Sequence, residues 1–304
     1  MRFGIVILPQ DPWPEARRKW QAAEQFGFDH AWTYDHLSWR SLADQPWHAT
    51  VPTLTAAALV TQRIRLGTFV SSPNYRHPVP FAKEIATLDD IAGGRFLLGV
   101  GSGGTGFDAF VLGQPEYTPA QRHERFAEFV GALDLLLRHE EQGGIRFDGD
   151  WFTAVDARMV GAAAQDPRVP FVIAANGPKG LRLVAEHGAG WVTTGRDGAT
   201  GEDWWSAVGD LVGRLEETAL AEGRDPATID RYLSLDSNGS YSLRSVAAFQ
   251  DAVGRAAELG FTDVISHWPR ADGIYAGTES VLEEVASTLT NPRENAVVVT
   301  KTPS

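Results

Sequence analysis

The stretch HAWTYDHLSW, residues 30–39, ends an apolar run in an aspartate, a histidine and a further tryptophan. A histidine side chain titrates near neutral pH, and a neighbouring carboxylate can orient its ring or raise its pKa. His36 is therefore a candidate for proton transfer, with Trp39 at the same site. Asp35 need not contact the ring, because adjacent side chains on an extended strand face opposite ways. A structural capping pair is the alternative interpretation.

A second candidate is the segment NGPKG, residues 176–180, which follows the apolar run PFVIAA. Its small residues let a ligand approach the backbone, and a helix that begins at Pro178 presents unpaired amides and a positive dipole end. Thr194, at the end of the next apolar run, could add a hydroxyl to the same anion. These residues predict a phosphate site. A plain strand-to-helix turn is the alternative, since such turns are common.

Three familiar motif classes find no support in the sequence. The glycine-rich run GVGSGGTG, residues 99–106, matches G-x-G-x-x-G, but no βαβ unit with an acidic ribose ligand follows it, so a Rossmann dinucleotide site is rejected. No HExxH or comparable cluster predicts a metal site. No GxSxG elbow supports serine hydrolase chemistry.

Composition excludes further classes. The chain of 304 residues has a formal net charge of -12, which disfavours non-specific nucleic-acid binding, and it has no cysteine, which rules out disulfides and thiol nucleophiles. No run of about 18 apolar residues could span a bilayer. The opening MRFGIVIL reads better as a first strand than as an export signal. A cytoplasmic enzyme acting on a small molecule fits these features.

Short apolar runs alternate with segments of helical spacing along the whole chain. Eight such runs predict strands, at residues 3–8, 30–34, 64–70, 95–100, 170–175, 190–194, 232–236 and 262–267. The helical segments lie at 14–26, 50–62, 78–92, 119–139, 178–187, 202–222, 243–259 and 278–289.

Eight β-α pairs predict an α/β fold, the (β/α)₈ TIM barrel, with a doubly wound open sheet as the alternative. We expect one domain over residues 1–290, followed by a C-terminal tail at 291–304. The segment 143–160 interrupts the pattern between strands four and five, and it predicts an inserted hairpin or loop over one mouth of the barrel.

Active sites of such barrels lie at the carboxyl ends of the strands. The residues that follow the predicted strands are therefore the ones to inspect. They are Asp35-His36, Ser71-Ser72-Pro73-Asn74, the loop GSGGTGFD at 101–108, Asn176-Gly177, Thr194-Gly195-Arg196, Asp236-Ser237-Asn238 and His267-Trp268.

Three blocks of the sequence resemble a known family. GFDHAWTYDHLSW, then TQRIRLGTFVSSPNYRHPVPFAKEIATLDDIAGGRFLLGVGSG, then PFVIAANGPKGLRLVAEHGAGWVTTG look like the bacterial luciferase-like superfamily, and within it most like the oxidoreductases that depend on coenzyme F420, a deazaflavin. The similarity covers about residues 1–195 and is most specific in the long middle block. Beyond residue 200 it is only architectural.

The resemblance implies a TIM barrel that binds a flavin or deazaflavin at the strand ends. It places Asp35 near the ring and makes His36 the proton donor or acceptor. A non-prolyl cis peptide after strand three maps to Ser71 and Ser72. Phosphate contacts map to the backbone around Asn176, Gly177 and Gly180 and to Thr194. Ala174 and Ala175, at the end of strand five, are further cofactor-binding positions.

Two departures from the family bear on cofactor and substrate. The sugar-phosphate dehydrogenases of the family carry a glutamate where Gly104 stands here, which disfavours glucose 6-phosphate and leaves Gly104 and Trp39 as candidate substrate contacts. The flavin mononucleotide (FMN) luciferases carry a phosphate-binding arginine where this chain has Ser102, which favours coenzyme F420 over FMN.

The sequence thus predicts hydride transfer between coenzyme F420 and an unidentified small organic substrate, with His36 handling the proton. The alternatives are an FMN-dependent monooxygenase and a flavin- or deazaflavin-binding protein without turnover. A homodimer is left open, because dimers are common in the family.

Overall fold

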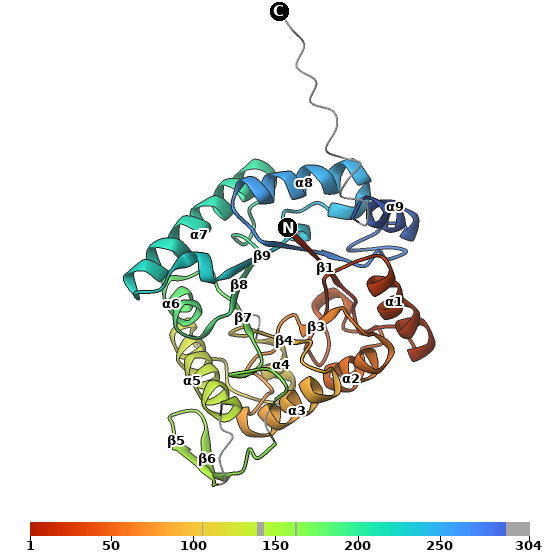
Figure 1. Cartoon of the computed structure of the whole chain (residues 1–304). Helices are drawn as coiled ribbons and strands as arrows, with labels where there is room; N and C mark the ends of the chain where they lie inside the picture. The colour runs from red at the N-terminus through yellow and green to blue at the C-terminus, as the bar shows by residue number, and fades with distance from the viewer. Residues whose placement is uncertain (105, 139–142, 162, 290–304) are drawn as a thin grey trace, which may run out of the picture.

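Eight parallel strands close into a barrel in this computed structural model, which describes residues 1–104, 106–138, 143–161 and 163–289. Going round the barrel the order is β1-β10-β9-β8-β7-β4-β3-β2 (Figure 1). Each of the eight predicted runs overlaps one of these strands, so the predicted TIM barrel is confirmed. The strands are β1 (Arg2–Val6), β2 (His30–Thr33), β3 (Arg65–Thr68), β4 (Phe96–Val100), β7 (Phe171–Ala174), β8 (Gly190–Thr193), β9 (Asp230–Ser234) and β10 (Asp263–His267).

A ring of helices surrounds the barrel (Figure 1). The eight predicted helical segments are all present, as α1 (Trp13–Gln25), α2 (Thr50–Val60), α3 (Pro78–Ile91), α5 (Pro119–Leu137), α6 (Pro178–His187), α7 (Gly201–Ala221), α8 (Val246–Glu258) and α9 (Glu279–Leu289). The short helix α4 (Phe107–Val111) lies in a stretch that the sequence predicted as a loop. With only five residues, it is too short to show helical periodicity.

Large rings inside the barrel lie against glycines on neighbouring strands. A Cβ on Gly67 would come 2.3 Å from the Trp32 ring, and one on Gly190 would come 2.7 Å from the Tyr232 ring. Trp32 and Tyr232 belong to a cluster of strand side chains that fills the interior, while a larger cluster packs between the strands and the helices. The interior is therefore a packed core, as in other barrels of this kind.

The insertion forms an antiparallel hairpin of β5 (Ile145–Asp148) and β6 (Thr153–Ala157), as predicted. Its predicted place over a barrel mouth is wrong, because Figure 1 shows it outside the ring of helices, beyond α5. The carboxylate of Glu128, on α5, accepts hydrogen bonds from the backbone N–H groups of Trp151 (3.1 Å) and Phe152 (2.6 Å). This charged acceptor holds the hairpin against the outer helix.

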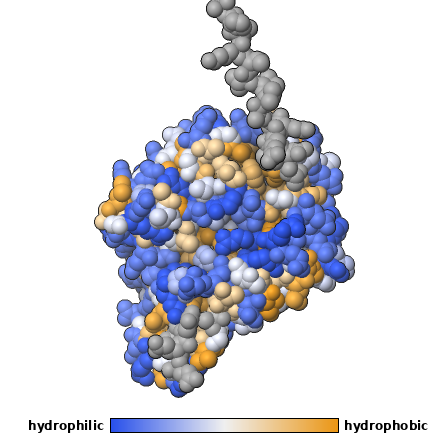
Figure 2. Space-filling model, in the orientation of Figure 1, coloured by the Kyte–Doolittle hydropathy of each residue, from blue (hydrophilic) through white to orange (hydrophobic). Residues whose placement is uncertain are grey.

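The surface on the side seen in Figure 2 is largely hydrophilic, with small scattered hydrophobic patches. In the described part of the chain, no helix is long and apolar enough to cross a bilayer. The predicted tail at 291–304 lies outside the described residues.

Replacing Gly99 by alanine should destabilise the barrel. A Cβ at this position on β4 would lie 1.9 Å from the carbonyl oxygen of Thr68 on β3, and backbone inside a sheet cannot give way cheaply. We expect a loss of at least about 3 kcal/mol of unfolding free energy in urea denaturation. The matched control is Gly131→Ala in α5, where a Cβ meets nothing within 4 Å, so alanine should stabilise by about 0.5 to 1 kcal/mol. Equal effects at the two positions would contradict this account.

Candidate active site

A cavity of about 640 Å³ opens at the carboxyl ends of the barrel strands. Residues from the ends of β2, β3, β4, β7, β8 and β9, or from the segments that follow them, line it, and Tyr275 from the segment after β10 completes the wall. Its volume falls in the range of ordinary small-molecule sites, roughly 300 to 1,000 Å³. The cavity therefore lies where the active sites of such barrels are expected.

Seven of the predicted site residues line this cavity, namely His36, Trp39, Gly104, Ala174, Ala175, Asn176 and Thr194. Three others, Asp35, Ser71 and Ser72, are buried, with 0%, 0% and 1% of their surface exposed. Gly177 and Gly180 lie at the start of α6, beside Asn176.

Sequence reasoning assigned no role to most other lining residues. They are Tyr34, Arg40, Phe69, Val70, Val192, Arg196, Asp197, Gly198, Asp236, Ser237 and Tyr275. Arg196, Asp236 and Ser237 stood directly after predicted strands, so the strand-end rule was a usable signal for them. Tyr275 lies eight residues beyond β10, in a segment without a motif, and only the folded chain brings it to the cavity.

His36 is paired with an aspartate that the sequence did not identify as its partner. Its Nδ1 lies 2.7 Å from Oδ2 of Asp108, in α4, and the other carboxylate oxygen accepts the backbone N–H of Leu37 at 2.8 Å. Asp108 is 1% exposed, whereas His36 lines the cavity and packs on Trp39 with ring centroids 4.4 Å apart. As the acceptor of this hydrogen bond, Asp108 holds the proton on Nδ1, which leaves Nε2 facing a bound molecule.

Asp35 is directed away from His36 and into a separate ion pair. Its carboxylate accepts from Arg76 at 2.6 and 3.1 Å and from the hydroxyl of Tyr75. Burial alone would raise the pKa of Asp35, but the charge and hydrogen bonds of Arg76 outweigh it and hold that pKa below its usual value. Asp35 is thus an ionised group that is fully occupied by protein partners.

The non-prolyl cis peptide lies between Phe69 and Val70, so its placement at Ser71 and Ser72 is corrected. Ser71 is engaged in regular pairing with β4, where its N–H donates to the carbonyl of Gly99 at 2.8 Å and its own carbonyl accepts from Gly101 at 2.9 Å. The ladder therefore resumes at Ser71, and the irregular linkage falls before it. Phe69 and Val70 both face the cavity.

Hydrogen bonds hold the segment that the sequence predicted to bind phosphate. The amide of Asn176 donates to the carbonyl of Gly195 at 2.7 Å and accepts from the hydroxyl of Thr193 at 2.6 Å. Gly177 precedes α6, and a Cβ there would project into open space. Asn176 therefore holds the loop after β8 in place and lines the cavity, directly before the start of α6.

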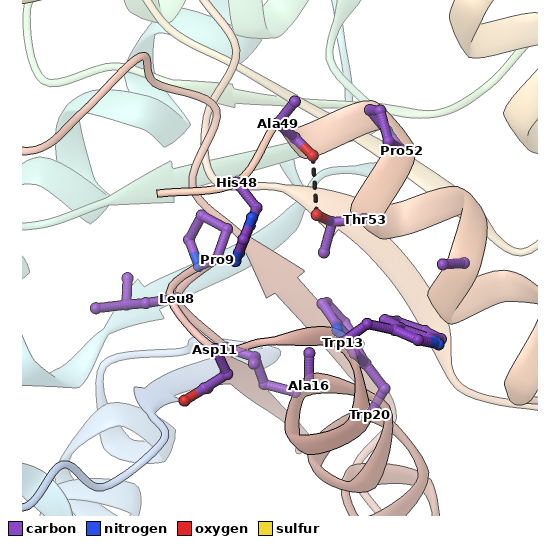
Figure 3. Close-up of a pocket in the computed structure, with 12 residues that line it drawn as sticks. Leu8, Pro9, Asp11, Trp13, Ala16, Trp20, His48, Ala49, Pro52 and Thr53 are labelled. Atoms are coloured by element: carbon purple, nitrogen blue, oxygen red, sulfur yellow. Dashed lines mark hydrogen bonds between the residues drawn. The ribbon is translucent and has the colours of Figure 1, made fainter. Parts of the chain in front are cut away.

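A second cavity, of about 330 Å³, lies between α1, α2 and the segment after β1 (Figure 3). Its wall includes Trp13, Trp20 and Pro52, and most of its lining is hydrocarbon. The carboxylate of Asp11 is paired with Lys19 at 2.8 Å, and His48 is exposed. This cavity has no histidine-carboxylate pair within its described lining, so the strand-end cavity is the better candidate for proton chemistry.

Comparison with known proteins decides the family. Residues 1–237 match the family described as luciferase-like monooxygenase. The chain belongs to this family.

Relatives of this luciferase-like protein include both dehydrogenases and oxygenases. It is 38% identical over 221 residues to an F420-dependent glucose-6-phosphate dehydrogenase of Beutenbergia cavernae, covering 70% of this chain and 60% of that one. It is 32% identical over 240 residues to a 4-hydroxyprotoasukamycin monooxygenase of Streptomyces nodosus subsp. asukaensis, covering 75% and 61%. The chain thus spans about three fifths of the length of these relatives.

The fold is also that of solved structures. An F420-dependent secondary alcohol dehydrogenase in complex with an F420-acetone adduct superposes with a TM-score of 0.75 at 19% identity, over 95% of this chain and 98% of that one. At this level of identity the likeness establishes the shared barrel.

Removing Arg76 should destabilise this luciferase-like protein in a pH-dependent way. Arg76→Ala leaves the Asp35 carboxylate buried and unpaired, so we expect a loss of about 3 to 5 kcal/mol at pH 7. In the wild type the ion pair stabilises the folded state at pH values above the pKa that aspartate has in the unfolded chain. This stabilisation is lost as the pH falls through the lower pKa of Asp35 in the folded chain. In the variant, burial raises the pKa of Asp35, so the deficit should shrink between pH 7 and pH 5. Urea denaturation at both values measures this.

The control for that experiment is Arg182→Ala, which removes an ion pair to Glu222 whose side chains are 67% and 48% exposed. It should change stability by less than about 0.5 kcal/mol at either pH. A deficit for Arg76→Ala that is the same at both pH values would refute the assigned role of the pair.

Proposed function

We propose that this luciferase-like protein is an oxidoreductase that transfers a hydride between coenzyme F420 and a small organic substrate, with His36 moving the accompanying proton. The observation that carries the proposal is the His36–Asp108 pair at the wall of the strand-end cavity. The relative from Beutenbergia cavernae and the superposed alcohol dehydrogenase are both named as F420-dependent, which supports the choice of cofactor.

The cavity suits a flat tricyclic ring that continues into a phosphate. One part of its wall is apolar, formed by Phe69, Val70, Ala174 and Val192, and another is polar, with Asn176, Thr194 and Arg196. A Cβ at Gly104 or Gly198 would meet nothing within 4 Å, so backbone at these lining positions lies open to a ligand. Apolar surface for the ring and directional donors for its tail are the two features that such sites combine.

When bound, the deazaflavin supplies the hydride donor or acceptor. The protein holds the ring and the substrate face to face in the cavity, and this positioning lowers the barrier. Asp108 keeps His36 in one tautomer, and Trp39 limits the ring's movement by packing on it at 4.4 Å. Nε2 of His36 is the atom that gives or takes the proton.

The phosphate is expected at the start of α6, on the amides that follow Asn176 and Gly177, with the Thr194 hydroxyl beside them. Arg196 adds a positive charge at the same end of the cavity. A helix N-terminus with a nearby cation favours an anion.

The substrate named for the relative from Beutenbergia cavernae is not carried over to this chain. Gly104 offers no carboxylate at the position where the sugar-phosphate dehydrogenases have a glutamate. We infer a different small organic substrate. A cytoplasmic location and a homodimer remain predictions.

Side-by-side binding of coenzyme F420 and FMN tests the cofactor. We expect fluorescence quenching by the purified protein to show F420 bound at micromolar or tighter affinity and FMN at least about tenfold more weakly, a difference of 1.4 kcal/mol or more. The reverse order would move the protein to the FMN monooxygenases, the class named for the relative from Streptomyces. Binding of neither compound would reject the proposal.

Substituting the His36–Asp108 pair tests the proton role. His36→Gln should lower turnover about 10²- to 10⁴-fold, because general acid-base catalysis contributes on that order. Asp108→Asn should lower it as well, because the amide no longer selects the tautomer with the proton on Nδ1. Affinity for F420 should change less than twofold in both variants. The control is His48→Gln at the exposed rim of the second cavity, which should keep wild-type turnover. If His36→Gln lowers turnover and F420 affinity by the same factor, the catalytic role of His36 is refuted.

A further inference from the structure

Another buried histidine-aspartate pair lies at the carboxyl ends of β9 and β10. His267 ends β10, and its Nδ1 lies 2.8 Å from Oδ2 of Asp236, which follows β9. The same carboxylate accepts the backbone N–H groups of His267 and Ser242, both at 2.7 Å. The two side chains are 2% and 1% exposed. Asp236 therefore fixes the imidazole ring and the tautomer with the proton on Nδ1.

Two tyrosines connect this pair to the strand-end cavity. Nε2 of His267 lies 2.8 Å from the hydroxyl of Tyr34, which lies 3.3 Å from the hydroxyl of Tyr275. The Tyr275 ring also stacks on the imidazole, with centroids 3.8 Å apart and planes inclined by 7°. Tyr34 and Tyr275 both line the cavity. A continuous row of exchangeable protons thus runs from a buried imidazole to the site.

The row has two states with opposite hydrogen-bond directions. When His267 is neutral, its Nε2 accepts from Tyr34, whose oxygen can accept from Tyr275. When His267 is an imidazolium, Nε2 donates to Tyr34, which in turn donates to Tyr275. The protonation state of the buried ring is therefore transmitted to a hydroxyl in the cavity.

We propose that Asp236, His267, Tyr34 and Tyr275 form a proton relay that serves the reacting oxygen of an alcohol or carbonyl substrate, with Tyr275 as the group that touches the substrate. This rests on the proposed function, because it needs coenzyme F420 as the hydride acceptor or donor. The relay serves the proton on the substrate oxygen, and His36 serves the proton that the coenzyme gains or loses. The substrate class follows from the end group, since a phenol hydroxyl exchanges protons with an oxygen through one short hydrogen bond.

In the oxidising direction the step balances as three coupled proton transfers. The substrate hydroxyl gives its proton to the oxygen of Tyr275, Tyr275 gives its own to Tyr34, and Tyr34 gives its own to Nε2 of His267. The substrate carbon gives up its hydride to the coenzyme, and the C–O bond becomes a carbonyl. Asp236 stays ionised and is paired with the new imidazolium. Reduction runs the same transfers backwards.

The charges around the relay suit this role. Burial raises the pKa of Tyr34 and the pKa of Tyr275, so both hydroxyls are protonated at neutral pH and can pass a proton on. Arg40 acts on both phenols in the opposite sense, as does Arg270 on Tyr275. Asp236 is the acidic group that faces them. The hydroxyl of Tyr241 donates to the backbone carbonyl oxygen of His267 at 2.8 Å, and its ring lies beside that of Tyr275 with centroids 6.1 Å apart.

The first test uses the whole protein without cofactor or substrate. In protein labelled with ¹⁵N-histidine, NMR measures how fast the imidazole proton of His267 exchanges with water, and the His267→Gln variant identifies its signal. Because the ring is buried, a relay predicts that Tyr34→Phe slows exchange at least tenfold. The control Tyr241→Phe removes a hydroxyl beside the same histidine and should leave the rate unchanged. A purely structural contact predicts that Tyr34→Phe leaves the rate the same or makes it faster, which would overturn the relay.

The second test uses the F420-loaded enzyme with propan-2-ol as the probe. Tyr275→Phe should lower kcat by 10- to 100-fold, with KM and F420 affinity within twofold. Unchanged kcat in Tyr275→Phe would overturn the role of Tyr275. The two proposals fail separately: absent F420 binding rejects the cofactor, whereas the NMR exchange rates judge the relay without it.

Discussion

The rest of the structure depends on one packing constraint inside the barrel. Large aromatic side chains there pack directly against the backbone of glycines on neighbouring strands. Trp32 on β2 occupies the space that a side chain on Gly67 would need, since a Cβ there would come 2.3 Å from the ring. Tyr232 and Gly190 repeat this arrangement on β9 and β8. These contacts let eight short strands close round a filled interior, and closure brings all their carboxyl ends to one mouth.

At that mouth the chain uses three buried carboxylates for different purposes. Asp35 is held by Arg76 and contributes to stability, whereas Asp108 and Asp236 each orient a histidine. The difference lies in the partner, because a guanidinium keeps a carboxylate ionised without a proton to move, while an imidazole can gain or lose one near neutral pH. Two oriented histidines at one cavity suit a reaction in which a proton accompanies a hydride.

The regular parts of the fold could be predicted because they follow from local pattern. Eight apolar runs, eight helical segments and the hairpin near 143–160 each leave a period or a composition in the sequence. Helix α4 leaves no such trace at five residues, and the outer position of the hairpin depends on contacts with α5, such as those of Glu128 and Phe129, that no local pattern encodes. The cis peptide was placed two residues late, because no pattern of residue types marks the bond between Phe69 and Val70.

The sequence by itself determined that this chain is a barrel and that His36 follows its second strand, because strand period, turn residues and the family motifs are local. Only the tertiary structure decided which groups surround that histidine. Asp108 reaches it from α4, and Asp35, its neighbour in sequence, turns away to Arg76 because side chains alternate along the extended chain. Tyr34 meets His267 only because β1 pairs with both β2 and β10 and closes the barrel, a contact that no local pattern encodes.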